Sequence, residues 1–139
     1  LDMTYDELHQ IPKPSSLPKN GCNIGLTAHD NREVFKNSLL CKADNSGMIV
    51  VYNGHENNVT TRIRSHFALN NDKTGALGLN HYPLSKKKWQ VKLFSMPCFQ
   101  DISADDKRQI EFLMNAPTGR CAVESAWRAK YGWPILSKE

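Results

Sequence analysis

The sequence lacks several features that would assign a protein to a class at once. No run of about 18 apolar residues occurs, so we expect no segment to span a bilayer and no membrane partner. The acidic and polar first residues are not typical of a secretion signal. No two cysteines form a CxxC pair, so a zinc site is not expected.

Cysteine is scarce, and its four positions are widely separated. A chain of 139 residues is long enough to bury one core without disulfide bonds. We therefore interpret the cysteines as reduced thiols and expect a cytoplasmic protein. They are Cys22, Cys41, Cys98 and Cys121.

Charge of one sign is not abundant either: 18 Lys and Arg residues against 14 Asp and Glu residues leave a net charge of +4. Residues 1–70 hold 7 of each sign, so the whole excess lies in residues 71–139, with 11 basic and 7 acidic residues. The densest cluster is Lys86-Lys87-Lys88. Such a surplus permits a nucleic-acid partner, and a solvated loop explains it equally well.

Residues 1–37 are predicted to be an N-terminal extension. Three prolines favour an extended arm over residues 9–21. Residues 22–37 are ambiguous, but Asp30 followed by Glu33 is typical of the start of a short helix.

Residues 38–139 are predicted to form one α/β (α+β) domain, in which helices flank a small, mostly antiparallel, three-stranded sheet. Turn chemistry at 44–47 joins two apolar runs into a hairpin, and the second run is expected to be buried on both faces. Capping residues (Asn57 or Asn58, Ser103 and Thr118) and apolar stripes predict the helices, and Gly132 is predicted to end the last one. Polar residues 70–88 predict a long loop. The predicted strands are 38–43, 48–52 and 89–96, and the predicted helices are about 59–67, 104–115 and 119–131. The helical residues expected to face the core are Val59, Ile63, Phe67, Ile110, Leu113, Met114, Val123, Ala126 and Trp127.

Four side chains make a set suited to phosphodiester hydrolysis. Tyr52 ends the second predicted strand, and Gly54 lets the backbone turn there. Arg62 and His66 lie four residues apart on one predicted helix, so they project together, and Glu124 lies on the last helix. A guanidinium binds phosphate in a planar fork, and a phenol or imidazole can move a proton. A single carboxylate with waters suits Mg²⁺.

Each of these residues also has an ordinary structural explanation when it is taken alone. The tyrosine is then a half-buried strand residue with a satisfied hydroxyl, and the arginine and glutamate are solvated helix residues. The histidine is then a structural or exposed residue. The hypothesis of a phosphodiester site therefore depends on all four occurring together.

The order and spacing of these residues resemble the second half of the GIY-YIG nuclease motif. The resemblance covers about residues 38–136. The matching segments are Tyr52-Asn53-Gly54, Arg62-Ile63-Arg64-Ser65-His66-Phe67 and Ala122-Val123-Glu124-Ser125-Ala126-Trp127.

This resemblance implies a metal-dependent endonuclease that hydrolyses phosphodiester bonds of double-stranded DNA, with Mg²⁺ as cofactor and Mn²⁺ as a substitute. It implies a phosphate-facing Arg62, an active-site Tyr52, a supporting His66 and a metal-binding Glu124. An enzyme of this kind is expected in the cytoplasm, associated with the nucleoid or nucleus. Its oligomeric state is not indicated.

The sequence departs from that family's pattern at two places. The family's first tyrosine should stand some eleven residues before the tyrosine of the matched motif, where Leu40 and Cys41 are found. Ser137 stands where an asparagine often follows the glutamate helix. Three explanations of the missing phenol stay open: a different hairpin register, a substitute group such as Tyr5 or Tyr82, or a weakened nuclease.

Basic and loop residues near the matched segments are secondary candidates for contacts with DNA. Lys42 is better explained as an exposed strand lysine, and the lysine cluster is equally well explained as a charged turn. The candidates are Lys42, Gly54, His55, Arg64, Lys86, Lys87 and Lys88.

Two further function classes stay open. A catalytically weakened nucleic-acid-binding module of the same fold would bind DNA in the presence of a chelator and never cut it. A protein-interaction domain would bind a partner with an affinity that does not fall with salt.

Overall fold

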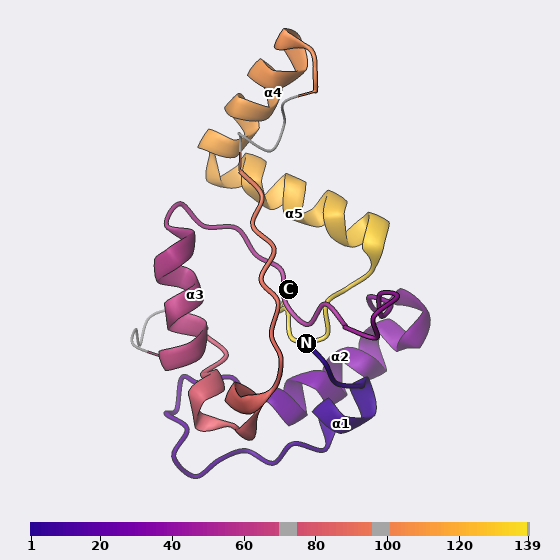
Figure 1. The fold of residues 1–139 in the computed structure, drawn as a ribbon, viewed down its shortest axis with the longest axis vertical. Coiled ribbons are helices and arrows are strands. Elements are labelled where there is room, and N and C mark those ends of the chain that lie inside the picture. The colour runs from indigo at the N-terminus through magenta and orange to yellow at the C-terminus, as the bar shows by residue number, and fades with distance from the viewer. Residues whose placement is uncertain (70–74, 96–100, 139) are drawn as a thin grey trace.

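The computed structural model describes residues 1–69, 75–95 and 101–138. Within these ranges the chain forms five α-helices and two short 3₁₀-helices (Figure 1). No helix there is long and apolar enough to cross a membrane. The elements are α1 (Tyr5–His9), α2 (Ile24–Leu39), α3 (Val59–Ala68), η1 (Leu79–His81), η2 (Pro83–Lys86), α4 (Ala104–Asn115) and α5 (Pro117–Tyr131).

The predicted three-stranded sheet is wrong. The described ranges contain no sheet, only one isolated parallel bridge between Leu40 and Trp133. The first predicted strand begins inside α2, and residues 89–95 of the third are irregular; residue 96 lies outside the described ranges. Propensity alone did not decide the outcome, because a strand also needs a neighbouring backbone with which to form a ladder.

The second predicted strand, 48–52, finds other backbone partners. Ile49 exchanges backbone hydrogen bonds of 3.0 Å with Leu1, and the Leu136 N–H donates to the Val51 carbonyl at 2.8 Å. Ile49 and Val51 are buried while Val50 is 37% exposed, so the expectation of burial on both faces is also wrong. The segment instead ties both ends of the described chain to one core.

The turn at 44–47 forms as predicted, although no hairpin follows it. The Asp44 carboxylate accepts hydrogen bonds from the backbone N–H groups of Ser46 and Met48 at 2.9 and 3.0 Å. Gly47 has a φ of 80°, which a residue with a side chain rarely adopts.

Capping residues explain where most helices begin. Asn58, one of the two predicted candidates, caps α3, and Ser103 caps α4 as predicted. Asn23, rather than Asp30, caps α2, so this helix is longer than predicted and is interrupted at Lys36, where φ is 51°. The predicted cap Thr118 is wrong, because it lies inside the last helix, which starts at Pro117 without a side-chain cap.

Gly132 ends α5, as predicted, for a reason beyond helix termination. Its φ is 96°, and a Cβ atom there would lie 2.7 Å from the Leu40 backbone. The chain passes Leu40 this closely because the Trp133 N–H donates to the Leu39 carbonyl at 2.7 Å. A glycine is therefore needed where α5 joins the C-terminal segment.

The core lies between α1, α2, the 3₁₀-helices and the C-terminal segment. The predicted extension supplies part of it, because Leu8, Leu17 and Ile24 belong to the same cluster as the later core residues. These later residues include Ile49, Val51, Leu79, Leu84, Ile135 and Leu136.

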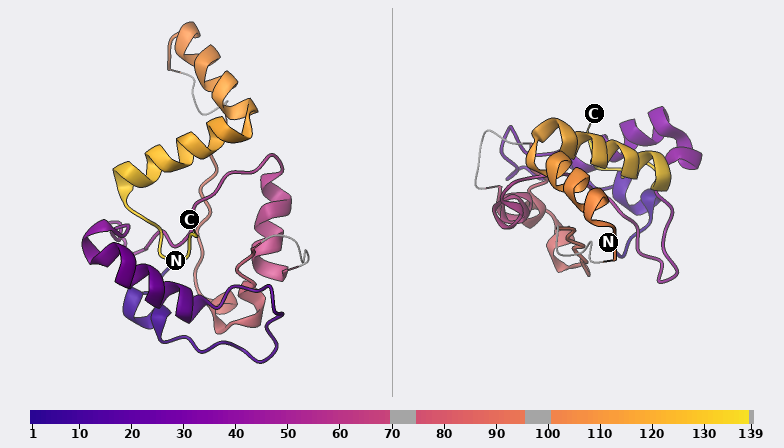
Figure 2. Two further views of the ribbon diagram at one scale, coloured as in Figure 1. Left: turned by 180° about the vertical axis from the view of Figure 1, so that it is seen from behind. Right: turned by 90° about the horizontal axis from the view of Figure 1, so that it is seen from above.

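The amphipathic stripes predicted for the helices are only partly buried: Phe67 packs against the core, and Ile63, Ile110, Met114 and Trp127 are half-buried. On α3 the buried residues are Ser65 and His66, whereas Val59 is 39% exposed. The hairpin formed by α4 and α5 lies at one end of the molecule; the two helices contact each other near their junction, and α4 projects away from the rest of the chain (Figures 1 and 2). None of the α4 residues is buried, and Val123 of α5 is 43% exposed. The hairpin therefore adds little to the core.

Candidate functional site

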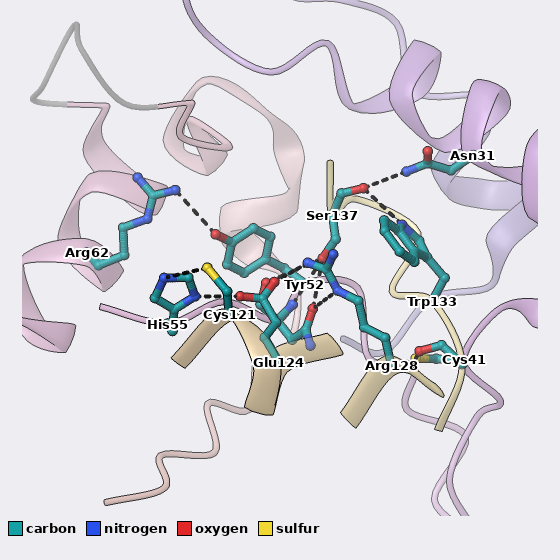
Figure 3. A network of polar contacts seen from close by, with 12 residues as sticks. Asn31, Cys41, Tyr52, His55, Arg62, Cys121, Glu124, Arg128, Trp133 and Ser137 are labelled. Atoms are coloured by element: carbon teal, nitrogen blue, oxygen red, sulfur yellow. Dashed lines mark hydrogen bonds and ion pairs between the residues drawn. The ribbon is translucent and has the colours of Figure 1, made fainter. Parts of the chain in front are cut away.

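A cavity of about 310 Å³ lies among the segment after residue 51, α3, α5 and the C-terminal segment. It receives three of the four predicted site residues, Tyr52, Arg62 and Glu124, which are far apart in the sequence. Gly54 and His55, both secondary candidates, also line it. Figure 3 shows His55 beside Glu124, with Arg62 next to Tyr52. The cavity thus brings together most of the set that the motif predicted.

Tyr52 is held between two residues of α3. Its hydroxyl accepts a hydrogen bond of 3.2 Å from an Arg62 guanidinium nitrogen, which also donates to the Gly75 carbonyl at 3.2 Å. The His66 ring lies against the Tyr52 ring with a centroid separation of 4.3 Å. The four-residue spacing of Arg62 and His66 therefore places both against one phenol.

Gly54 leaves the space that the Tyr52 hydroxyl occupies. A Cβ atom at position 54 would lie 2.7 Å from the hydroxyl oxygen. Any larger residue would displace the phenol from Arg62. The glycine of the matched motif therefore acts on the position of the tyrosine side chain.

His66 is a buried, neutral positioning residue in this arrangement. Its Nδ1 accepts a hydrogen bond from the Leu77 N–H at 3.3 Å, so the ring proton is on Nε2. Within the described ranges, Nε2 has no hydrogen-bond partner. Burial, with a smaller effect of Arg62, lowers the pKa of His66 to about 4. At neutral pH the ring therefore supports Tyr52 by packing.

Both oxygens of the Glu124 carboxylate are engaged. One accepts a hydrogen bond from Arg128, one turn further along α5, and the other lies 2.8 Å from His55 Nδ1. Arg128 also donates from Nε to the Asn53 side-chain oxygen at 2.9 Å and stacks over the Trp133 ring at 4.2 Å. These contacts hold α5 against the segment that carries Tyr52.

Ser137 completes this network from the C-terminal segment. It is fully buried, and its hydroxyl accepts from the Asn53 N–H at 3.2 Å. Its carbonyl accepts from the Trp133 indole at 3.1 Å and from the Asn31 amide at 2.9 Å. Ser137 therefore helps to position Asn53, which in turn binds Arg128.

Fixed positive charge outnumbers negative charge in the cavity lining. The lining holds Arg62, Arg128 and Lys138 but one carboxylate, that of Glu124. Among the described residues, no three His, Cys, Asp or Glu side chains are arranged so that they could hold one metal ion. A carboxylate already paired with a guanidinium is a poor ligand for a second cation, because the two cations repel each other. As arranged, the donor set does not suit Mg²⁺ and instead suits an anion.

No second phenol joins Tyr52 in the described part of the cavity lining. The Tyr5 hydroxyl donates to the Cys41 carbonyl, and burial raises the pKa of Tyr5. The Tyr82 hydroxyl donates to the Cys22 carbonyl at 2.7 Å and accepts from the Ile24 N–H at 3.3 Å. Both phenols that were considered as substitutes are therefore engaged elsewhere.

The remaining basic candidates do not line the cavity. Lys42, Arg64 and the cluster Lys86-Lys87-Lys88 are exposed, and the cavity lining includes none of them. Their role as DNA contacts stays a prediction.

Sequence reasoning missed Asn53, Arg128 and Lys138, and it noted Cys121 only as a reduced thiol. The spacing of Glu124 and Arg128, four residues apart on one helix, was a signal that could have identified this pair. The Asn53 contact offered no such signal, because its partners come from distant segments. No family model, curated protein or solved structure matches this chain.

Proposed function

We propose that this cavity binds a phosphate group of the DNA backbone and that the protein hydrolyses the phosphodiester bond. The observation that carries the proposal is the convergence of Tyr52, Arg62 and Glu124 in a cavity with three fixed positive charges. A groove with excess positive charge attracts a polyanion and lowers the energy of charge that develops on a phosphate.

The cationic side chains bind the phosphate. The Arg62 guanidinium presents a planar set of donors that matches two phosphate oxygens, and Lys138 adds a point charge. Arg62 also donates to the Tyr52 hydroxyl at 3.2 Å, so a phosphate bound there lies beside the phenol. Tyr52 then orients the attacking water by a hydrogen bond.

His55 is the general base of the proposed reaction. When its Nδ1–H donates to Glu124 at 2.8 Å, its Nε2 carries the lone pair. This nitrogen lies 3.6 Å from the Cys121 sulfur and can accept a proton from the attacking water. The Glu124 carboxylate keeps this tautomer and stabilises the imidazolium that forms. Metal binding by Glu124 stays a prediction from the family resemblance, and no step here passes through a metal.

Nicking of supercoiled plasmid tests the proposal, in Mg²⁺, in Mn²⁺ and in a chelator. Arg62→Ala is expected to lower the nicking rate on the order of 100-fold, as the loss of one anion-stabilising group does. Glu124→Gln is expected to abolish nicking. The matched control is Arg108→Ala, which removes an arginine of α4 that pairs with Asp105 at the surface and is expected to nick at the normal rate. Full activity of Arg62→Ala would contradict the proposal.

A second candidate is a phosphate-binding module without catalysis. The ion pair between Glu124 and Arg128 and the engaged phenols of Tyr5 and Tyr82 favour it. This module would retain DNA in chelator, lose affinity steeply with salt and never nick the plasmid. The same assay, run beside a binding titration, separates the two candidates.

A further inference from the structure

Cys121, His55 and Glu124 form a line of three side chains at the edge of the cavity. The Cys121 sulfur lies 3.6 Å from His55 Nε2, and His55 Nδ1 lies 2.8 Å from a Glu124 oxygen (Figure 3). Cys121 is exposed, whereas the Glu124 side chain is 16% exposed. A nucleophile, a base and a group that orients the base are thus in contact, and the nucleophile faces solvent.

We propose that Cys121 is a nucleophilic thiol that forms mixed disulfides with small anionic disulfides. The Nδ1–H of His55 donates a hydrogen bond to Glu124, so Nε2 carries the lone pair that faces the thiol. The imidazole can then take the thiol proton, and the thiolate is the reactive form of cysteine. This proposal does not depend on the proposed function.

The charge around His55 selects the disulfide. His55 lines the cavity that holds Arg62, Arg128 and Lys138, so a disulfide with carboxylates is attracted toward Cys121 and a cationic disulfide is repelled. Low-molecular-weight disulfides built from acidic peptides fit this requirement. Neutral disulfides gain neither attraction nor repulsion.

The exchange is balanced without another reactant. His55 takes the proton of the Cys121 thiol, and the thiolate attacks one sulfur of the disulfide R–S–S–R. A new bond forms between Cys121 and that sulfur while the original sulfur–sulfur bond breaks. The departing thiolate takes the proton from the His55 imidazolium and leaves as R–SH.

The two buried cysteines provide an internal comparison. Cys22 contacts the Thr27 hydroxyl at 3.4 Å, and burial raises the pKa of its thiol. The Cys41 thiol donates to the Gly132 carbonyl at 3.0 Å, and burial raises its pKa to about 11. Neither cysteine is therefore expected to exchange in the folded protein.

The rate of mixed-disulfide formation at each cysteine tests the proposal. All reactions use the Cys98→Ser protein, because residue 98 lies outside the described ranges. The protein is incubated at pH 7 with one of two disulfides: oxidised glutathione, which is anionic, or cystamine, which is cationic. Peptide mass spectrometry gives the rate at each site, and the same reactions in urea give the rate of an unstructured cysteine. We expect Cys121 alone to react in the native protein. Its preference for oxidised glutathione over cystamine should exceed that in urea by about tenfold.

Two variants separate activation from simple exposure. His55→Ala is expected to slow exchange at Cys121 on the order of 100-fold, whereas His29→Ala, which removes an exposed histidine of α2, should leave the rate unchanged. Circular dichroism confirms that each variant is folded. A native rate equal to the rate in urea, or a normal rate in folded His55→Ala, would overturn the proposal.

The same reaction is distinguishable from phosphodiester hydrolysis. Cys121→Ser should lose mixed-disulfide formation but keep any plasmid nicking, because a serine hydroxyl cannot exchange with a disulfide yet leaves a hydrogen-bonding group beside His55 Nε2. Mixed-disulfide formation by a protein that never nicks plasmid would refute the hydrolase and leave the thiol proposal standing.

Discussion

The body of the molecule and the α4–α5 hairpin (residues 104–131) are held by different kinds of contact. In the body, Leu8, Ile24 and Ile135 are each 0% exposed and belong to one core. In the hairpin, Phe112 is 77% exposed, and the link to the body depends on Arg128, which contacts Asn53 and Trp133. Burial of apolar surface stabilises the first region, whereas polar and cation–π contacts position the second.

This difference places the candidate site on a boundary. Tyr52 and Arg62 belong to the body, and Glu124 reaches them from the hairpin. Any change that loosens α5 should therefore damage the site before it unfolds the body.

The largest effect is expected in the body. Ile24→Ala removes a side chain that is 0% exposed, and it should lower the free energy of unfolding by about 2–5 kcal/mol because a cavity is left in the core. The matched control is Leu26→Ala on the same helix, where the side chain is 55% exposed and the loss should be below about 0.5 kcal/mol. Urea denaturation measures both. Equal losses would contradict the assignment of the core.

His66 should make the stability of the body depend on pH. Burial lowers its pKa from 6.5 to about 4, so as the pH is lowered the unfolded chain binds a proton at a higher pH than the folded chain does. The free energy of unfolding therefore keeps its full value above pH 6.5 and falls by about 3 kcal/mol as the pH is lowered toward 4. Urea denaturation at several pH values measures the loss. His66→Gln should remove this part of the dependence, and an unchanged slope in that variant would show that His66 is not its source.

Arg128→Ala should loosen the hairpin. The Arg128 side chain is 14% exposed, and the substitution removes its contacts with Glu124, Asn53 and Trp133. We expect a loss of about 1–3 kcal/mol, measured by urea denaturation, and faster amide exchange in α5 than in α2. In the control Arg108→Ala, the lost ion pair is 77% and 76% exposed, so little change is expected. Uniformly faster exchange across both regions would argue against a separately held hairpin.

The smallest effect is expected at the exposed face of α4. Phe112→Ala should change the free energy of unfolding by less than about 0.5 kcal/mol, because the ring is 77% exposed in the folded protein. A loss comparable with that of Ile24→Ala would show that this face is covered in solution. Urea denaturation at two protein concentrations distinguishes coverage by a second copy from coverage within one chain.

Local structure was predictable where one or two neighbouring residues decide it. Asn58, Ser103 and Gly132 act as the sequence indicates, because caps and stops depend on backbone groups only a few positions away. The turn at Asp44 formed for the same reason. The sheet was not predictable in this way, because Ile49 pairs with Leu1 and Val51 with Leu136, and both partners are distant in the sequence.

In the candidate site too, contacts between neighbours in the sequence were predictable and contacts between distant segments were not. The spacing of Arg62 and His66 predicted that they project together, since residues four apart share a helix face, and the structure places both beside Tyr52. The engagement of Glu124 by His55 and the contact of His55 with Cys121 could not be predicted, because no periodicity links a loop to a distant helix.

The sequence by itself determined the helix boundaries named above, the turn at Asp44 and the set of chemical groups available to the site, since these depend on residue type and on near neighbours. The tertiary structure alone decided that extended segments pair outside a sheet, that α4 remains exposed and that Glu124 is paired with Arg128 and His55. The physical reason is that burial and long-range hydrogen bonds depend on which distant segments meet, and that is a property of the whole packed chain.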